Sequence, residues 1–155
     1  MSLLRPVPAS EKTPFRAMLT DYLVEDHPEV GFDLHDFPTF DAYWTAPHRY
    51  PFWIERRGEP VGLALVSDLY APSGQSVDHG LVEYYIVPGA RRTGIGMAAA
   101  LALFRAMPGL WELAVHGANP VSMAFWPRVI EALNPSDWQR LPHGDGDVVH
   151  RFNTG

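Results

Sequence analysis

The chain has 155 residues, of which 46% are hydrophobic, and it carries 12 Lys and Arg against 18 Asp and Glu. This length favours one globular domain over residues 1–155 and excludes two full domains. The net charge of -6 argues against a nucleic-acid partner, because binding a phosphate backbone requires a basic face.

Several further classes are excluded by what the sequence lacks. No apolar run approaches the roughly 20 residues that cross a bilayer, and the N-terminal segment lacks the basic start and apolar stretch of a signal peptide. The absence of cysteine excludes disulfides and a cysteine nucleophile, and it fits a reducing compartment. The seven histidines show no ligand spacing, so no metal site is predicted. We expect a soluble cytoplasmic protein without membrane contact.

The first third of the chain predicts a strand and a helix. Residues 3–7 favour a short strand, and Ser10 is expected to cap a helix that runs to about Glu25. One side of this helix is an apolar stripe made of Phe15, Met18, Leu19, Tyr22 and Leu23. Residues 26–49 mix carboxylates, aromatic side chains and prolines, and this composition predicts a loop with one short helix.

The middle of the chain predicts a hairpin, a strand and a helix. Residues 51–70 read as a hairpin because two β-rich runs flank residues 57–60, Arg-Gly-Glu-Pro. A strand at 81–87 follows, and the Ala- and Leu-rich run 94–107 predicts a helix that ends at Pro108-Gly109.

The last third predicts a strand at 110–115, a helix opened by Asn119-Pro120 and two strands within 136–152. Pro127 is expected to kink or break that helix, at a cost of about 3 kcal/mol. Because a whole helix separates 81–87 from 110–115, these two strands are expected to be parallel in an otherwise antiparallel, and so mixed, sheet.

The most informative segment is VEYYIVPGARRTGIG, residues 82–96, which passes from a strand through a loop into a helix. The first amides of a helix have no internal partner and the helix dipole adds positive charge, so a phosphate or pyrophosphate can bind there. Arg91 and Arg92 add guanidinium groups that suit phosphate oxygens, while Gly94 and Gly96 allow close approach. A structural loop with surface arginines is the alternative.

A dinucleotide-binding interpretation also has to be considered. GIGMAA, residues 94–99, satisfies the GxGxxA pattern, and Glu112 lies roughly where a ribose-binding acid is sought. In that fold, however, the first glycine directly follows the strand, whereas here residues 88–93 intervene. Fewer than 60 residues remain for further βα units, so this interpretation is rejected.

At the same residues the sequence resembles the GNAT superfamily of acyl-CoA-dependent N-acyltransferases, whose signature is Arg/Gln-x-x-Gly-x-Gly/Ala. Arg91, Gly94 and Gly96 match it, and the resemblance extends from Leu81 to about Leu133. It implies that the amides of 92–97 bind the CoA pyrophosphate and that the backbone of two preceding residues pairs with the pantetheine arm. The cofactor-binding residues are then Ile86, Val87, Arg91, Arg92, Thr93, Gly94, Ile95, Gly96, Met97 and Asn119.

The resemblance also implies a fold and a cleft. The fold is α+β, a single domain with a mixed, mostly antiparallel twisted sheet of six to seven strands and about four helices. Two central parallel strands, 81–87 and 110–115, splay apart to leave room for the thioester and the amine. Asn119 has two compatible interpretations, as a helix cap and as a contact of the cofactor arm.

Amine acylation needs an uncharged nucleophile, and an alkyl amine with a pKa near 10.4 is mostly protonated at pH 7. Glu83 is the candidate catalytic base, or else a holder of the cationic amine; a solvent-facing strand residue is the alternative. Trp126 stands where many family members carry a Tyr that protonates the departing sulfur, and an indole is no acid. Trp126 is expected to line the cleft or pack in the core. Tyr84 and Tyr85 are weaker candidates for the general acid.

We expect an N-acetyltransferase that moves an acetyl group from acetyl-CoA to a primary amine of a small molecule or peptide. The resemblance implies that segment 26–49 is the acceptor wall, where Asp33, Asp36 and Asp41 and several aromatic side chains would suit a cationic or aromatic amine. A solvated loop anchored by its aromatic side chains is the alternative. A non-catalytic acyl-CoA-binding module is the alternative, and a plain α+β domain is the third possibility. A homodimer is left open.

Overall fold

The computed structural model describes residues 2–26 and 39–155. These residues form a seven-stranded sheet in the order β1-β2-β3-β4-β5-β7-β6, with helices on both faces. The strands are β1 (Leu4–Pro6), β2 (Arg49–Arg56), β3 (Glu59–Ser67), β4 (His79–Ile86), β5 (Leu110–Val115), β6 (Asp137–His143) and β7 (Asp147–Asn153). The α-helices are α1 (Lys12–Asp26), α2 (Ala42–Thr45), α3 (Ile95–Ala106) and α4 (Pro120–Leu133), and the 3-10 turns are η1 (Ala9–Glu11) and η3 (Pro88–Ala90).

The sheet is mixed, as expected. Strands β1 to β4 pair antiparallel in chain order, β4 and β5 pair parallel, and β7 pairs antiparallel with both β5 and β6. The parallel pair is joined through α3, the crossover that parallel pairing requires. The expected α+β fold is therefore confirmed. Within the described ranges no helix is long and apolar enough to cross a membrane.

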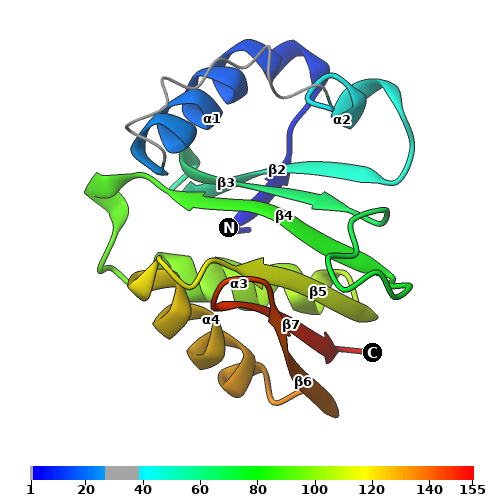
Figure 1. Ribbon diagram of the computed structural model, residues 1–155. Helices are drawn as coiled ribbons and strands as arrows, with labels where there is room; N and C mark the ends of the chain where they lie inside the picture. Colours follow the sequence, from blue (N-terminus) through cyan, green and yellow to red (C-terminus); the bar gives the residue numbers. More distant parts are fainter. Residues whose placement is uncertain (1, 27–38) are drawn as a thin grey trace.

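Two helical layers enclose the sheet, with α1 and α2 on one face and α3 and α4 on the other (Figure 1). Strand β3 shows why, because it is apolar on both sides. Leu63 and Leu65 pack with α1 in one core cluster, whereas Ala64 and Val66 pack with α3 and α4 in the other. All four side chains are fully buried, which explains the continuous apolar run in this strand.

The hairpin turn is tighter than predicted. Arg57 and Gly58 form a two-residue connection, with φ of 55° and 80°, and Arg56 faces Glu59 across it. Two positive φ values in succession fit the right-handed twist of the flanking strands. Pro60 therefore belongs to β3 and not to the turn.

Two predictions about helices were wrong, one of them in part. Ser10 lies inside η1 and does not cap α1, which begins at Lys12 after the 3-10 turn. Of the predicted kink or break at Pro127, the break does not occur, since α4 is continuous through this residue. Proline removes one backbone hydrogen bond, but Trp126 and Ile130 on either side are buried in the core, and their packing holds the helix together.

The central parallel pair separates along its length, and this separation positions the site. Residues 79–81 of β4 pair with 111–113 of β5, and the pairing stops there although both strands continue. On its other edge β4 carries a bulge, because Val66 faces Leu81 while Leu65 faces Glu83. Val82 is the extra residue in this bulge.

Candidate active site

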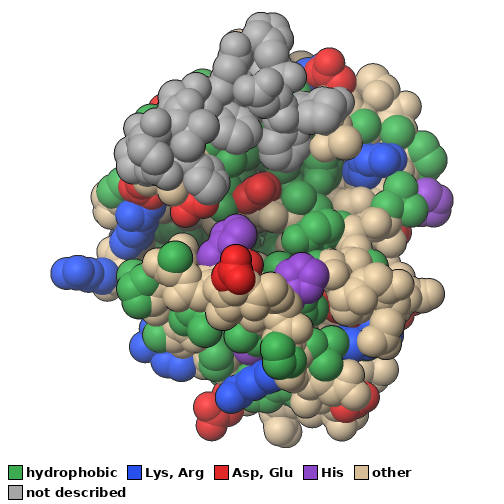
Figure 2. All heavy atoms as spheres, viewed as in Figure 1, with side chains coloured by type: hydrophobic (Ala, Val, Ile, Leu, Met, Phe, Trp, Pro, Cys, Tyr) green, Lys and Arg blue, Asp and Glu red, His purple; other side chains and the backbone are tan. Residues whose placement is uncertain are grey.

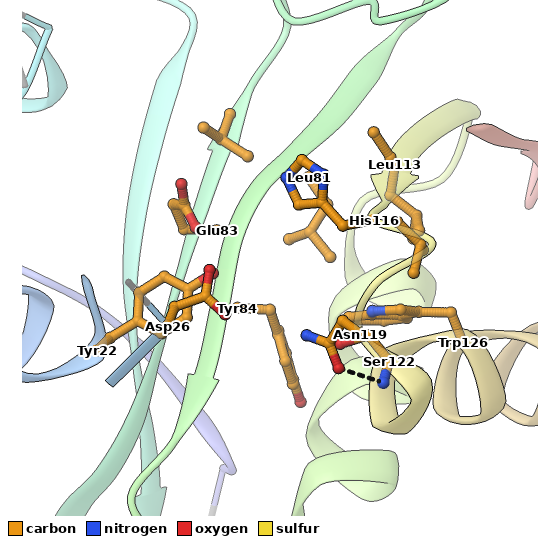
Figure 3. A pocket seen from close by; sticks show the side chains of 13 residues that line it. Tyr22, Asp26, Leu81, Glu83, Tyr84, Leu113, His116, Asn119, Ser122 and Trp126 are labelled. Carbon is orange, nitrogen blue, oxygen red and sulfur yellow. Dashed lines mark hydrogen bonds between the residues drawn. The ribbon is translucent and has the colours of Figure 1, made fainter. Parts of the chain in front are cut away.

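A small cavity of about 90 Å³ lies where β4 and β5 separate. Figure 3 shows side chains of α1 and β4 on one side of it and side chains of the β5 end and α4 on the other. Figure 2 shows acidic and histidine side chains gathered around a hollow on this face of the molecule. The cavity is lined by Tyr22, Asp26, Leu81, Val82, Glu83, Tyr84, Leu113, Ala114, Val115, His116, Asn119, Ser122 and Trp126.

Glu83 lines this cavity because the bulge changes the phase of β4. In a regular strand Leu81, Glu83 and Tyr85 would share one face. Here Leu81 packs with the α3 and α4 cluster, whereas Tyr85 packs with the α1 cluster. The extra residue thus turns Glu83 toward α1, where it interacts with Tyr22.

The pKa of the Glu83 carboxyl group is shifted toward neutral pH. Burial raises its pKa from the ordinary 4.5 to about 7, and the negative charge of Asp26 acts in the same direction. Hydrogen bonding from Tyr22 and the positive charge that His116 can carry act in the opposite direction. A carboxyl group that changes protonation near pH 7 suits general base catalysis.

The start of α3 presents a row of backbone amides without acceptors. Gly94 is the N-cap residue with φ of 83°, and the first helical hydrogen bond runs from the amide of Ala98 to the Gly94 carbonyl. Between residues 92 and 97 only the Ile95 amide has a partner, the Thr93 hydroxyl at 3.4 Å. These amides and the helix dipole together form a site that fits a diphosphate.

The two signature arginines play different parts. Arg91 donates to the Ile86 carbonyl at 2.9 Å, pairs with Glu25 at 2.5 Å and lies over the Tyr85 ring. Arg91 therefore ties the loop to α1 and β4. Arg92 is exposed with φ of 61°, so its guanidinium is the one left to meet an anion in this loop.

At the end of β4, just before the loop, several backbone polar groups already have hydrogen-bond partners. The Val87 amide donates to the Val61 carbonyl at 2.9 Å and the Val87 carbonyl accepts from the Ala90 amide at 3.0 Å. The Ile86 carbonyl is occupied by Arg91. The predicted pairing of Ile86 and Val87 with a pantetheine arm stays a prediction, and the Ile86 amide is the group that remains for it.

A family model for acetyltransferases, described as the acetyltransferase (GNAT) family, matches residues 15–130. The chain belongs to this family. Its members transfer acetyl groups, so the protein is an acetyltransferase with acetyl-CoA as cosubstrate. No curated protein sequence matches the chain.

Solved structures show the same fold at low sequence identity. An acetyltransferase from Thermus thermophilus is 20% identical, with a TM-score of 0.65, and covers 97% of this chain and 95% of that one. The PaiA N-acetyltransferase from Thermoplasma acidophilum, solved with coenzyme A, is 11% identical, with a TM-score of 0.65 and 99% of each chain covered. An aminoglycoside 6′-N-acetyltransferase complexed with coenzyme A is 14% identical, with a TM-score of 0.64, and covers 99% and 98%.

The tyrosines considered as general acids of this GNAT protein are engaged elsewhere. The Tyr84 hydroxyl donates to the Gly96 carbonyl at 2.5 Å, and burial raises the pKa of Tyr84. Tyr85 packs between Tyr22 and Arg91. Trp126 is 7% exposed, packs edge-on against Tyr84 and also lines the cavity, so both of its expected roles are observed.

Asn119 caps α4 as predicted. Its side-chain oxygen accepts from the Ser122 amide at 3.0 Å, and the residue also lines the GNAT cleft. Glu112 is fully buried, where it binds Ser73 and Arg151. This structural role agrees with the rejection of a ribose-binding acid.

The structure describes only part of segment 26–49, the expected acceptor wall. Asp33 and Asp36 lie outside the described residues. Asp41 forms an ion pair with Lys12 at the start of α1, and its side chain is 73% exposed. The Asp41 carboxylate is thus engaged by Lys12, and Asp41 does not line the cavity.

Sequence reasoning missed two residues of the GNAT cleft. Tyr22 was assigned only to the apolar stripe of α1, although its side chain reaches Glu83. His116 follows β5 directly, and its Nδ1 lies 3.3 Å from a carboxylate oxygen of Asp147. Its position at the end of a splayed strand was the available signal, but the contact depends on the far hairpin that carries Asp147.

Proposed function

We propose that the protein transfers the acetyl group of acetyl-CoA to a primary amine of a small molecule or peptide, by direct attack. The observation that carries this proposal is the Glu83 carboxyl group, which faces the gap between β4 and β5 and has a pKa of about 7. No covalent enzyme intermediate is needed, because the amine itself attacks the thioester.

The amides of residues 92–97, of which only that of Ile95 has an acceptor, would hold the diphosphate of acetyl-CoA together with the exposed Arg92. The pantetheine arm would run from there along the open edge of β4, past Ile86, and reach the cavity between the strands. Asn119 borders this path and can meet the arm through its side-chain amide nitrogen, because its oxygen is used in the cap.

Glu83 would accept the proton that the amine loses, directly or through a water molecule. The amine nitrogen bonds to the acetyl carbonyl carbon, the bond from that carbon to sulfur breaks, and the electron pair leaves on sulfur as a thiolate. Burial favours the neutral form of Glu83, so the carboxylate is a stronger base there than on the surface.

The acceptor side of the cleft supports a cationic amine. Asp26 and Tyr22 line it beside Glu83. Burial raises the pKa of Tyr43 and of Tyr70, and the Glu83 charge acts in the same direction on both. Carboxylates and aromatic rings both attract an ammonium group before it is deprotonated.

A thiol-release assay over a panel of amines tests the proposal. The chain has no cysteine, so a thiol-reactive dye reports CoA without background from the protein. Glu83→Gln is expected to lower kcat/KM by about 10²-fold or more, whereas the matched variant Glu131→Gln, at an exposed site on α4, leaves it unchanged.

Two results would contradict the proposal in different ways. If Glu83→Gln retains full turnover, the catalytic base is assigned to the wrong residue. If acetyl-CoA binds but no amine is acetylated, the non-catalytic acyl-CoA-binding module is the better description.

A further inference from the structure

His116 stands across the cleft from Glu83. It follows the last residue of β5 and lines the cavity, and in Figure 3 its ring extends from the end of β5 toward β4. Glu83 lines the same cavity from β4, so the two side chains face one space. The thioester would lie between the strands that carry these two groups.

Asp147 positions the His116 ring through a contact with its Nδ1. One carboxylate oxygen lies 3.3 Å from His116 Nδ1, and the other accepts the Gly117 amide at 2.9 Å. The turn before β7 packs tightly here, since a Cβ on Gly117 would lie only 2.4 Å from the Gly146 carbonyl oxygen. With Nδ1 facing Asp147, Nε2 is the ring nitrogen available to a ligand in the cleft.

No other described residue of the cleft suits the role of proton donor to sulfur. The Tyr84 hydroxyl is bound to the Gly96 carbonyl, and Trp126 has no acidic proton. Burial and the Glu83 charge raise the pKa of Tyr22, which makes it a poorer acid. Imidazole both holds and releases a proton near neutral pH.

We propose that His116, positioned by Asp147, protonates the CoA sulfur as it departs. This inference rests on the proposed acetyl transfer. The bond from the acetyl carbon to sulfur breaks, the electron pair goes to sulfur, and the proton on His116 Nε2 follows it. The proton lost by the amine goes to Glu83. A proton then passes from Glu83 back to His116, directly or through water, and both groups regain their starting states.

Several charged or titratable groups surround His116. Asp147 faces it from β7, while Glu83 from β4 and Asp26 from α1 share the cleft with it. A backbone hydrogen bond lowers the pKa of Asp147, and the positive charge that His143, at the end of β6, can carry acts in the same direction. His48, an exposed residue just before β2, does not line the cavity, and His48→Asn is therefore a matched control for His116→Asn.

The first test is the pH dependence of kcat. His116→Asn is expected to lower kcat by about 10²-fold and to abolish the alkaline limb of the profile, with KM for acetyl-CoA within twofold of wild type. His48→Asn should keep the wild-type kcat and the alkaline limb. Asp147→Asn should lower kcat less and move the alkaline limb to lower pH, because a carboxylate beside an imidazolium favours the charged form. An alkaline limb that persists in His116→Asn would overturn the proposal.

The second test needs no acceptor. The thiol of bound CoA is titrated through the ultraviolet absorbance of its thiolate, in wild type and in His116→Asn. The thiol should ionise at lower pH on the wild-type protein, and this effect should vanish in His116→Asn. Equal titrations in the two proteins would overturn the assignment of His116. If the effect depends on His116 but no amine is acetylated, the proposed function fails while the contact of His116 with sulfur stands.

Discussion

Replacing Glu83 by glutamine should make the protein more stable at alkaline pH than at acidic pH, relative to wild type. The folded-state pKa of Glu83 is raised from 4.5 to about 7, so its neutral form favours folding. That contribution is complete below pH 4.5 and is lost as the pH rises through about 7. The difference between the two pKa values, at about 1.4 kcal/mol per pH unit, corresponds to about 3 kcal/mol of folding free energy. This figure is an upper limit, because the carboxyl group lines an open cleft where solvent screens its charge.

Urea denaturation of both proteins at pH 5 and pH 8 measures this effect. The free energy of unfolding of Glu83→Gln minus that of wild type should increase by about 2 to 3 kcal/mol between the two pH values. Taking this difference cancels the contributions of titrating groups that do not interact with Glu83. The exposed control Glu131→Gln should show no such increase. A difference for Glu83→Gln that stays constant with pH would refute the burial of this carboxyl group in the folded protein.

Three further substitutions test the parts that shape the site. Asn119→Ala should lower the free energy of unfolding by about 1 kcal/mol, because it removes the helix cap, and Asn119→Asp should restore it. Gly94→Ala should cost about 1 to 2 kcal/mol and weaken CoA binding in calorimetry, since its φ is 83°; Gly89→Ala, equally open but without positive φ, should do neither. Arg151→Met should cost about 3 to 5 kcal/mol in urea denaturation, because the Glu112 carboxylate would stay buried without its partner.

The fold could be predicted from the sequence where local chemistry decides it. The glycine and proline stops bound the helix before β5 to within a residue, and the Asn119-Pro120 start of α4 is where the cap is observed. The local proline rule does not predict that α4 continues through Pro127, because the neighbouring side chains are buried in the core. Tertiary packing outweighed the lost hydrogen bond there.

The site was predictable only in part, for a different physical reason. The amides at the start of α3 follow from the loop sequence, since glycine at positive φ opens the helix. The face of Glu83 depends on a bulge whose register is set by the partner strand, so alternation along β4 alone gives no answer. The position of His116 depends on Asp147, about thirty residues away, through a contact that no local pattern encodes.

An amide NMR titration tests the binding of the CoA diphosphate by the backbone most directly. Isotope-labelled protein is titrated with CoA and, separately, with pantetheine, which lacks the diphosphate. The amides of residues 92–97, which have almost no acceptors in the free protein, should show the largest shifts with CoA and small shifts with pantetheine. Unchanged amide signals at residues 92–97 under saturating CoA would contradict the assignment of this site.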